Sequence, residues 1–532
     1  MKKFFFLIIV CITPVPAKDT KPALIVYISI DQMRADYFDR YGHYFTGGFS
    51  RLYHQGITYT NADLNYATSE TGPGHATLGT GCFPWKSGIQ GNEWIEVHTL
   101  NDTYCVSDSA AKPVDGIGGG FSPRNLVVTA IGDWLKNESP KSKVITASLK
   151  DRAAILMGGK HPDYAFWYSQ SVGGMVTSDY YAQSLPAWVK KFNTSNWAEK
   201  NVPQQWAKSL AEKEYAKIGP DEFEAESQWN DDTSFPHAFT EGKRNEQIMG
   251  SPYGDKLIVD FAMKAVESEQ LGSRGVTDLL CISLSNCDYV GHAMGPDSHE
   301  MLDLLVKVDR YLGDLFTFLD KRVGKDRYIV ALSADHAVCP LPEFNSKNRN
   351  ISAKRYDYKN DVKAKVDSLS RSLQQEFNAT DEIIHKNAFL NYAAAQKAGI
   401  DSVHLEQKVR AGLLSIETFV DVFFRRELLS RSPSTKPFIE KYRNSYYAPR
   451  GEDFQYRIRE NCIISSHLYG STHGSPYEYD THIPVLFWRD GIRPRKISRP
   501  IFSADVAPTL ATCVGFTYPE NIDGTPLMEV VR

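Results

Sequence analysis

Five short runs of apolar and β-branched residues, spread over the whole chain, limit the possible folds more than any other part of the sequence. Runs of this length and composition are typical of strands buried on both faces, as in parallel sheets. Helical patterns lie between them, the clearest at residues 298–323. We therefore predict an α/β fold with a mostly parallel central sheet sandwiched by helices. The five runs are ALIVYISI (23–30), KVITASL (143–149), DLLCISLS (278–285), RYIVALS (327–333) and IPVLFW (483–488).

Two long segments, at about residues 158–275 and 340–465, interrupt this alternation. The first opens with a hairpin-like stretch that turns at Gly173-Gly174, and the second carries helical patterns at 360–376 and 402–428. No internal repeat or Gly/Ser linker divides the chain into independent parts. We expect both segments to be insertions that form the rim of a pocket.

The first residues read as an export signal. Lys2 and Lys3 precede an apolar run, and small residues lead up to Ala17, which is the pattern of a cleavable signal peptide. The apolar run is too short to span a bilayer comfortably. We therefore predict a signal peptide over residues 1–17 and one domain over residues 18–532. The mature protein is expected to be periplasmic or secreted, with no integral membrane segment.

The charge and the cysteine content limit the classes of partner that the protein can bind. A formal net charge of −4 gives no basic excess for binding nucleic acid, so we expect small-molecule partners and no nucleic acid. Seven cysteines follow residue 17, none in a CxxC pair, which disfavours a thiolate zinc site. Their pairing stays open, and an odd number leaves at least one without a partner in the same chain.

Charged and imidazole side chains lie at the ends of the predicted strands. In open α/β sheets, ligands bind beyond the carboxyl ends of the strands. A single aspartate there is usually a turn or helix cap, and a single Asp-His pair is more often a loop feature, but the set as a whole favours a metal centre. Mixed carboxylate and imidazole ligands suit Zn²⁺ best, with Mn²⁺ or Fe as alternatives. The set consists of Asp31, Asp288, His292, Asp335, His336 and His473.

The stretch SETGPGHATLGTG (69–81) places Thr71 just before a Gly-Pro pair. A Ser or Thr ahead of a Pro at the first helical position is a common helix start. From these residues alone, Thr71 is either a helix cap or a hydroxyl aimed at a ligand.

Several motifs occur in the order seen in the alkaline phosphatase superfamily, and the chain resembles its bacterial branch with a threonine nucleophile, the PafA-like alkaline phosphatases. The resemblance spans about residues 23–528. It implies two zinc ions per chain, the first on Asp288, His292 and His473 and the second on Asp31, Asp335 and His336, with Thr71 as a further ligand and as the nucleophile. The motifs are ISIDQMRADY, TSETGPGHAT, GNEWIE, SLKDRA, NCDYVGHAMGPDS, SADHA and STHGSPYEYDTHIPVLFW.

The resemblance implies hydrolysis of small-molecule phosphate monoesters through a phosphothreonine intermediate, in the service of phosphate acquisition. Coordination to zinc lowers the pKa of a hydroxyl, so that an alkoxide can form at Thr71. Asn92, Lys150 and Arg152 match residues that bind the phosphoryl group in the resembling family. Read alone, Asn92 is a turn residue and KDR a solvated turn, although an extended backbone would point Lys150 and Arg152 to the same side.

Two other functions stay open. A phosphodiesterase or nucleotide pyrophosphatase of the same superfamily shares the metal ligands and the threonine nucleophile, but lacks the Lys150–Arg152 pair. The remoter alternative is a non-catalytic relative that binds a metal or ligand. A sulfatase is disfavoured because CFPWK ends in Lys86, where the sulfatase signature has arginine.

His75 and His482 are expected to be structural. The natural substrate stays open, as does the oligomeric state, with a monomer slightly favoured.

Overall fold

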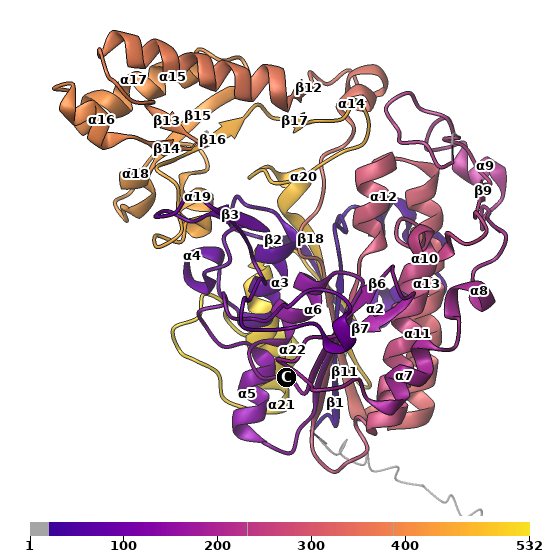
Figure 1. The fold of residues 1–532 in the computed structure, drawn as a ribbon. Coiled ribbons are helices and arrows are strands. Elements are labelled where there is room, and N and C mark those ends of the chain that lie inside the picture. The colour runs from indigo at the N-terminus through magenta and orange to yellow at the C-terminus, as the bar shows by residue number, and fades with distance from the viewer. Residues whose placement is uncertain (1–20, 231, 387, 532) are drawn as a thin grey trace, which may run out of the picture.

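The computed structural model describes residues 21–531 except residues 231 and 387; the predicted signal peptide lies outside this range. A single large sheet organises the described residues (Figure 1). Its ten strands follow the order β19-β2-β18-β11-β1-β10-β5-β6-β7, with β20 paired to β2. The strands are β1 (Leu24–Ile30), β2 (Ile57–Asp63), β5 (Val144–Ser148), β6 (Tyr164–Ser169), β7 (Gly174–Val176), β10 (Asp278–Leu284), β11 (Tyr328–Ser333), β18 (His482–Arg489), β19 (Arg495–Ile497) and β20 (Ile501–Phe502).

The middle of this sheet is parallel, as predicted. Strands β11, β1, β10, β5 and β6 pair in parallel, and every residue of β1, β5, β10 and β11 is buried. The prediction was wrong for residues 483–488, because β18 runs antiparallel to both β11 and β2. A burial pattern does not record strand direction. In this orientation the loop that precedes β18 lies at the same edge as the loops that follow β1 and β11.

Helices cover both faces of the sheet, as expected. Figure 1 shows α11 (Pro252–Glu269) and α13 (His299–Leu319) on one side, and α3 (Thr71–Thr80) and α6 (Asp151–Gly158) on the other. The predicted helix at 298–323 is confirmed as α13. Its buried face includes Met301, Leu305, Leu312 and Leu319.

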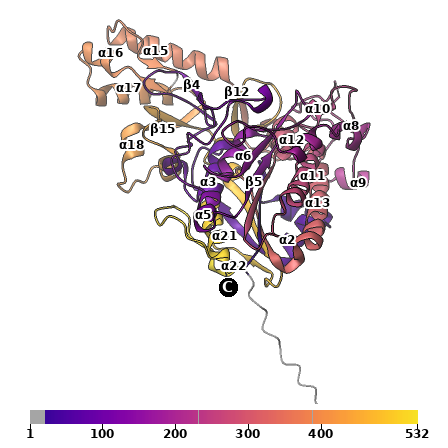
Figure 2. The same cartoon turned by 60° about the horizontal axis from the view of Figure 1, so that its bottom comes forward.

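Much of the segment at 340–465 forms a separate lobe, whose apolar core is built from residues 362–454 (Figures 1 and 2). The lobe contains α15 (Ala364–Glu376) and α17 (Ser402–Leu414), and β15 (Phe419–Phe424) pairs antiparallel with β16 (Phe454–Ile458). The predicted helix at 402–428 was therefore too long. Its second half, FVDVFF, is rich in β-branched and aromatic residues and forms a strand instead.

The segment at 158–275 is only partly an insertion. The hairpin at Gly173-Gly174 is confirmed, since β6 and β7 are antiparallel and Gly173 adopts a positive φ of 62°. This hairpin extends the central sheet, and α11 packs on the sheet as an ordinary covering helix. Within the described ranges, no helix combines the length and apolar character needed to cross a membrane.

Candidate active site and metal centre

The fold brings the six predicted metal ligands together at one edge of the sheet. Asp31 follows β1, and Asp335 and His336 follow β11. Asp288 and His292 lie one turn apart on α12 (Asn286–Met294), and His473 lies in the loop before β18. Ligand atoms of two groups lie within 4.8 Å of one another, and His336 belongs to both. The groups are Asp31, Asp335 and His336, and Asp288, His336 and His473.

The first group presents buried polar atoms that no hydrogen bond satisfies. Asp31 Oδ1, Asp335 Oδ2 and His336 Nε2 all lack a hydrogen bond, although His75 Nδ1 lies 3.2 Å from Asp335 Oδ2. His336 Nε2 lies 3.6 Å from Asp31 Oδ1 and 3.5 Å from Asp335 Oδ2. Because His336 Nδ1 donates to the Ala337 carbonyl at 3.0 Å, Nε2 carries a lone pair.

The pKa shifts in the first group also indicate a site that a cation would stabilise. Burial, followed by the neighbouring Asp335 carboxylate, raises the pKa of Asp31 well above its usual range. Burial lowers the pKa of His336 to about 3, so its imidazole is neutral, as a metal ligand requires. The orphaned oxygens and the neutral nitrogen together fit a divalent metal ion.

The second group is built from imidazoles and a carboxylate. His292 Nδ1 donates to the Ser471 carbonyl at 2.8 Å, and His473 Nδ1 donates to the Ser69 carbonyl at 2.5 Å. These bonds turn the two Nε2 atoms toward each other, 3.1 Å apart. Asp288 Oδ1 lies 3.2 Å from His292 Nε2 and 3.5 Å from His473 Nε2.

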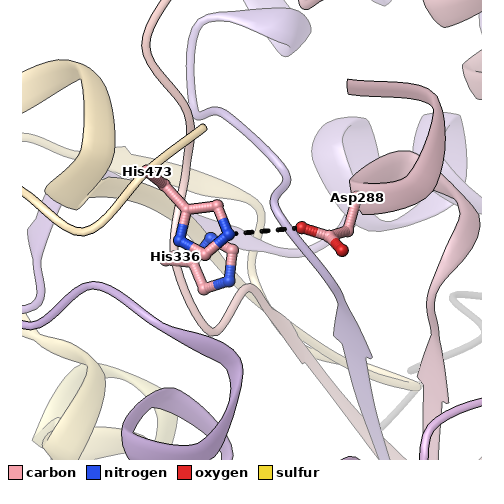
Figure 3. Close-up of side chains that lie close together, drawn as sticks. All are labelled: Asp288, His336 and His473. Atoms are coloured by element: carbon pink, nitrogen blue, oxygen red, sulfur yellow. Dashed lines mark ion pairs between the residues drawn. The ribbon is translucent and has the colours of Figure 1, made fainter. Parts of the chain in front are cut away.

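Figure 3 shows Asp288 facing the stacked rings of His336 and His473, whose centroids are 3.7 Å apart. The Nε2 atoms of His292 and His473 face each other, and two ring nitrogens that both carry lone pairs repel at this distance. A metal ion or a proton between them removes that repulsion. The donor set fits zinc. His336, which the resemblance assigned to the second ion alone, also lies within reach of this group.

Lys150 lies between the two groups. Its ammonium donates to Asp31 Oδ2 at 2.7 Å and to Asp288 Oδ2 at 2.5 Å, and its side chain is 2% exposed. Arg152 Nη2 lies 3.4 Å from Thr71 Oγ1. The predicted extended backbone is wrong, because Lys150 is the N-cap of α6 and Arg152 lies in its first turn. The helix begins directly at the strand end, yet both cations reach the site.

Thr71 is 1% exposed and is the first residue of α3. Glu70, rather than Thr71, is the N-cap, so the capping interpretation of Thr71 is wrong. Asn92 Oδ1 accepts from the Gly72 N–H at 2.7 Å, and the Asn92 N–H donates to Glu70 Oε2 at 2.7 Å. Asn92 is therefore held against the start of α3, beside the hydroxyl.

Sequence reasoning missed two residues. Gln32 Nε2 donates to Asp288 Oδ1 at 2.7 Å, and the Gln32 N–H donates to Asp335 Oδ1 at 3.1 Å, so Gln32 joins the two groups. Tyr104 accepts a hydrogen bond from Arg152 Nη1 at 3.3 Å. Adjacency to Asp31 is the only sequence signal for Gln32, and Tyr104 has none.

His75 and His482, which were expected to be structural, both contact other protein groups. His75 is fully buried, with Nδ1 3.0 Å from the Thr71 carbonyl and Nε2 2.8 Å from Ser283 Oγ. It also lies 3.2 Å from Asp335 Oδ2, behind the first group. His482 Nε2 lies 3.0 Å from the Thr60 carbonyl, at the start of β18. All seven cysteines among the described residues are unpaired.

Comparison with known proteins places the chain in a family. Residues 25–404 match the family model "Type I phosphodiesterase / nucleotide pyrophosphatase". The chain is 33% identical to a protein of Myroides odoratus named calcium-transporting ATPase, over 96% of this chain and 95% of that one. It is also 33% identical to alkaline phosphatase PhoV of Synechococcus elongatus, over 97% of this chain and 94% of the relative.

A solved structure agrees with these matches. The crystal structure of wild-type alkaline phosphatase PafA superposes with a TM-score of 0.87 at 31% identity, covering 96% of this chain and 99% of that one. The chain belongs to the type I phosphodiesterase/nucleotide pyrophosphatase family and, within the alkaline phosphatase superfamily, to the PafA-like alkaline phosphatases.

Proposed function

We propose that this protein is a zinc-dependent phosphate monoester hydrolase that works through a covalent phosphothreonine intermediate on Thr71. The observation that carries the proposal is the convergence of a buried hydroxyl, a guanidinium and two imidazole–carboxylate groups at one sheet edge. Relatives named alkaline phosphatase, similar over nearly their whole length, support it. ATPases that form an aspartyl phosphate use a carboxylate nucleophile, whereas the group beside Arg152 here is a threonine hydroxyl.

Two zinc ions would be held by the residues of the site. When bound, they would neutralise the negative charge that develops on the attacking and departing oxygens. The orphaned oxygens of Asp31 and Asp335 and the facing Nε2 atoms of His292 and His473 support this assignment. The ligands would be Asp288, His292 and His473 for one ion, and Asp31, Asp335 and His336, with Thr71, for the other.

The protein groups supply the nucleophile and hold the phosphoryl group. Thr71 Oγ1 gives up its proton and attacks phosphorus in line, the bond from phosphorus to the alcohol oxygen breaks, and that oxygen takes up a proton and leaves as the alcohol. Water then attacks the same phosphorus and breaks its bond to Oγ1, which takes up a proton from the attacking water, so that inorganic phosphate is released and the hydroxyl is restored.

Three features would bind the phosphoryl oxygens in both steps. Arg152, already within reach of Thr71 Oγ1, offers a planar pair of donors. The start of α3 adds a favourable helix dipole. Asn92 accepts from Gly72 through Oδ1, which leaves its NH₂ end as the donor.

Phosphodiester hydrolysis is the second candidate, because the matching family model is described by that activity. The positive charges of Lys150 and Arg152 distinguish the monoesterase from the diesterase. A monoester dianion carries one more unsubstituted oxygen than a diester, and Lys150 and Arg152 place two positive charges at the site. Their proximity favours the monoester.

The test compares kcat/KM for an aryl phosphate monoester with that for its matched methyl diester. A large monoester preference supports the proposal, and a diester preference would make the second candidate the better one. Label from a ³²P-monoester should be trapped on Thr71 by acid quenching.

We further propose that the protein is exported to the periplasm or secreted. The support is the sequence pattern of residues 1–17. N-terminal sequencing of the protein recovered outside the cytoplasm should give a chain that begins at Lys18.

A further inference from the structure

A cavity of about 260 Å³ lies between the start of α3 and the outer lobe. Three residues of its wall, Glu70, Gly91 and Gly474, directly adjoin Thr71, Asn92 and His473 in the chain. The opposite wall comes from the lobe and includes Glu452 and Tyr456. A group attached to a phosphate at Thr71 would therefore have this cavity beside it. We call it the acceptor pocket.

Hydrogen-bond acceptors dominate the polar lining of the acceptor pocket. The carboxylates of Glu70, Glu93 and Glu452 line it, and none of the described lining residues is Lys or Arg. These three acids come from different segments of the chain, and Glu93 is exposed to solvent. Such a lining disfavours an anionic leaving group and favours a cationic one.

Two buried amide oxygens in the same wall lack partners. Gln90 is 6% exposed; its Nε2 donates to the Arg450 carbonyl at 2.8 Å, while its Oε1 has no hydrogen bond. Gln455 Nε2 donates to Glu452 Oε2 at 3.4 Å, and its Oε1 is also unpartnered. Buried acceptors without donors are costly. Both NH₂ groups already donate to protein acceptors, so the two glutamines add no free donor that would compete with a cationic ligand.

Electrostatics and aromatic rings add to this picture. Burial, with a further contribution from Glu70 and Asp453, raises the pKa of Glu452, and a bound cation would relieve that penalty. Tyr442 and Tyr456 also line the pocket, and both line a neighbouring cavity of about 190 Å³ beside His473. Aromatic faces attract ammonium groups.

We infer that the acceptor pocket binds the alcohol part of the substrate and selects phosphate monoesters of amino alcohols, whose ammonium group donates N–H hydrogen bonds. The inference rests on the proposed phosphatase activity and adds a substrate class to it. It also gives the lobe a function, since Glu452, Gln455 and Tyr456 all belong to residues 340–465.

The test measures kcat/KM of the zinc-loaded protein on 2-aminoethyl phosphate, 2-hydroxyethyl phosphate and an aryl phosphate. The amino ester should exceed the hydroxy ester about tenfold, the effect of one charge-assisted hydrogen bond. Choline phosphate, which has the charge but no N–H donor, should fall below the amino ester. Equal values for choline phosphate and the amino ester would overturn the hydrogen-bonding assignment.

Variants locate the effect. Glu452→Gln should bring the ratio of amino to hydroxy ester toward one while circular dichroism stays native. Glu460→Gln, an exposed lobe residue outside the pocket, carries the same charge change and should keep the wild-type ratio. Glu93→Gln, which neutralises a second carboxylate of the pocket, is the second variant and should lower the ratio while circular dichroism stays native.

The outcomes separate the two proposals. Equal kcat/KM for the amino and hydroxy esters in the wild type, or an unchanged ratio in both pocket variants, would overturn the inference, while turnover of the aryl phosphate would leave the phosphatase proposal standing. Absence of turnover on every monoester would overturn both.

Discussion

Lys150 touches both groups of candidate metal ligands. Its ammonium contacts carboxylates of Asp31 and Asp288, which are predicted to serve different metal ions. Burial opposes its charge, but these two carboxylates raise its pKa above the usual value. Truncating Lys150 therefore removes a phosphate-binding candidate and also leaves two buried carboxylates without their ion-pair partner. Any kinetic test at this position needs a stability measurement beside it.

The double variant Lys150→Ala/Arg152→Ala should lose monoester turnover by several orders of magnitude. Each charge-assisted contact is worth about 1.5–3 kcal/mol, and both cations approach the site. Diester turnover should change far less. The measurement is kcat/KM on both substrates, with thermal unfolding as the control. An equal fall on both substrates would assign the pair a structural role and favour the diesterase.

Thr71→Ala should lose most turnover, whereas Thr71→Ser should retain a substantial part. Serine offers a hydroxyl at the first residue of α3, and alanine offers none. Burst kinetics with the aryl phosphate should disappear in the alanine variant. A retained burst there, or label trapped on another residue, would contradict the assignment.

At the scale of elements, strand positions were predictable and strand directions were not. The runs at 23–30, 143–149, 278–285 and 327–333 match β1, β5, β10 and β11 to within one residue at each end. A strand that is buried on both faces leaves an unbroken run of apolar residues in the local sequence, and that run can be recognised without knowing the strand's neighbours. The direction of β18 depends on its partners β2 and β11, which are remote in sequence.

Helix α12, which carries Asp288 and His292, is tied to α11 by a buried carboxyl. Asp255 Oδ1 accepts from the Asn286 N–H and from Asn286 Nδ2, both at 3.1 Å, while Oδ2 has no partner. Burial raises the pKa of Asp255 to about 7, against 3.8 as the ordinary value, although the bonds from Asn286 lower it. Between about pH 4 and pH 7 the folded protein keeps a proton that the unfolded chain has released, so this group makes the free energy of unfolding fall as pH rises.

Asp255→Asn should therefore stabilise the protein at pH 8 relative to wild type, by up to a few kcal/mol, and have little effect near pH 4. The asparagine can keep the Oδ1 acceptor and does not ionise. The measurement is the melting temperature across this pH range. Asp326→Asn, at an exposed position, removes the same charge and should show no such trend. A stabilisation independent of pH would refute the explanation.

For the whole molecule, metal binding should be coupled to stability. The site gathers the buried carboxylates of Asp31, Asp288 and Asp335, and ligands that bind only the folded state stabilise it. Chelator treatment should abolish turnover and lower the melting temperature, and Zn²⁺ should restore both better than Mg²⁺, which prefers all-oxygen sites. Full activity in a preparation free of transition metals by elemental analysis would contradict the zinc proposal.

The sequence revealed the candidate ligands because strand ends meet at one edge whatever the details of packing. Gln32 and Tyr104 were not predictable, since their roles depend on contacts with Asp288, Asp335 and Arg152. The acceptor pocket was also hidden. Its walls come mainly from residues 67–70 and 90–93 and from a lobe whose placement against the sheet leaves no pattern in the local sequence (Figure 2).

The central position of β18 has a consequence for the order in which the chain can fold. This strand is made near the end of synthesis, yet it lies between β2 and β11, inside the sheet. Until residues 482–489 emerge, both neighbours expose open edges, which are sites of aggregation. His473 emerges only shortly before them. A chain truncated before His473 would thus combine exposed strand edges with an incomplete set of candidate metal ligands, so it would be inactive and prone to aggregate.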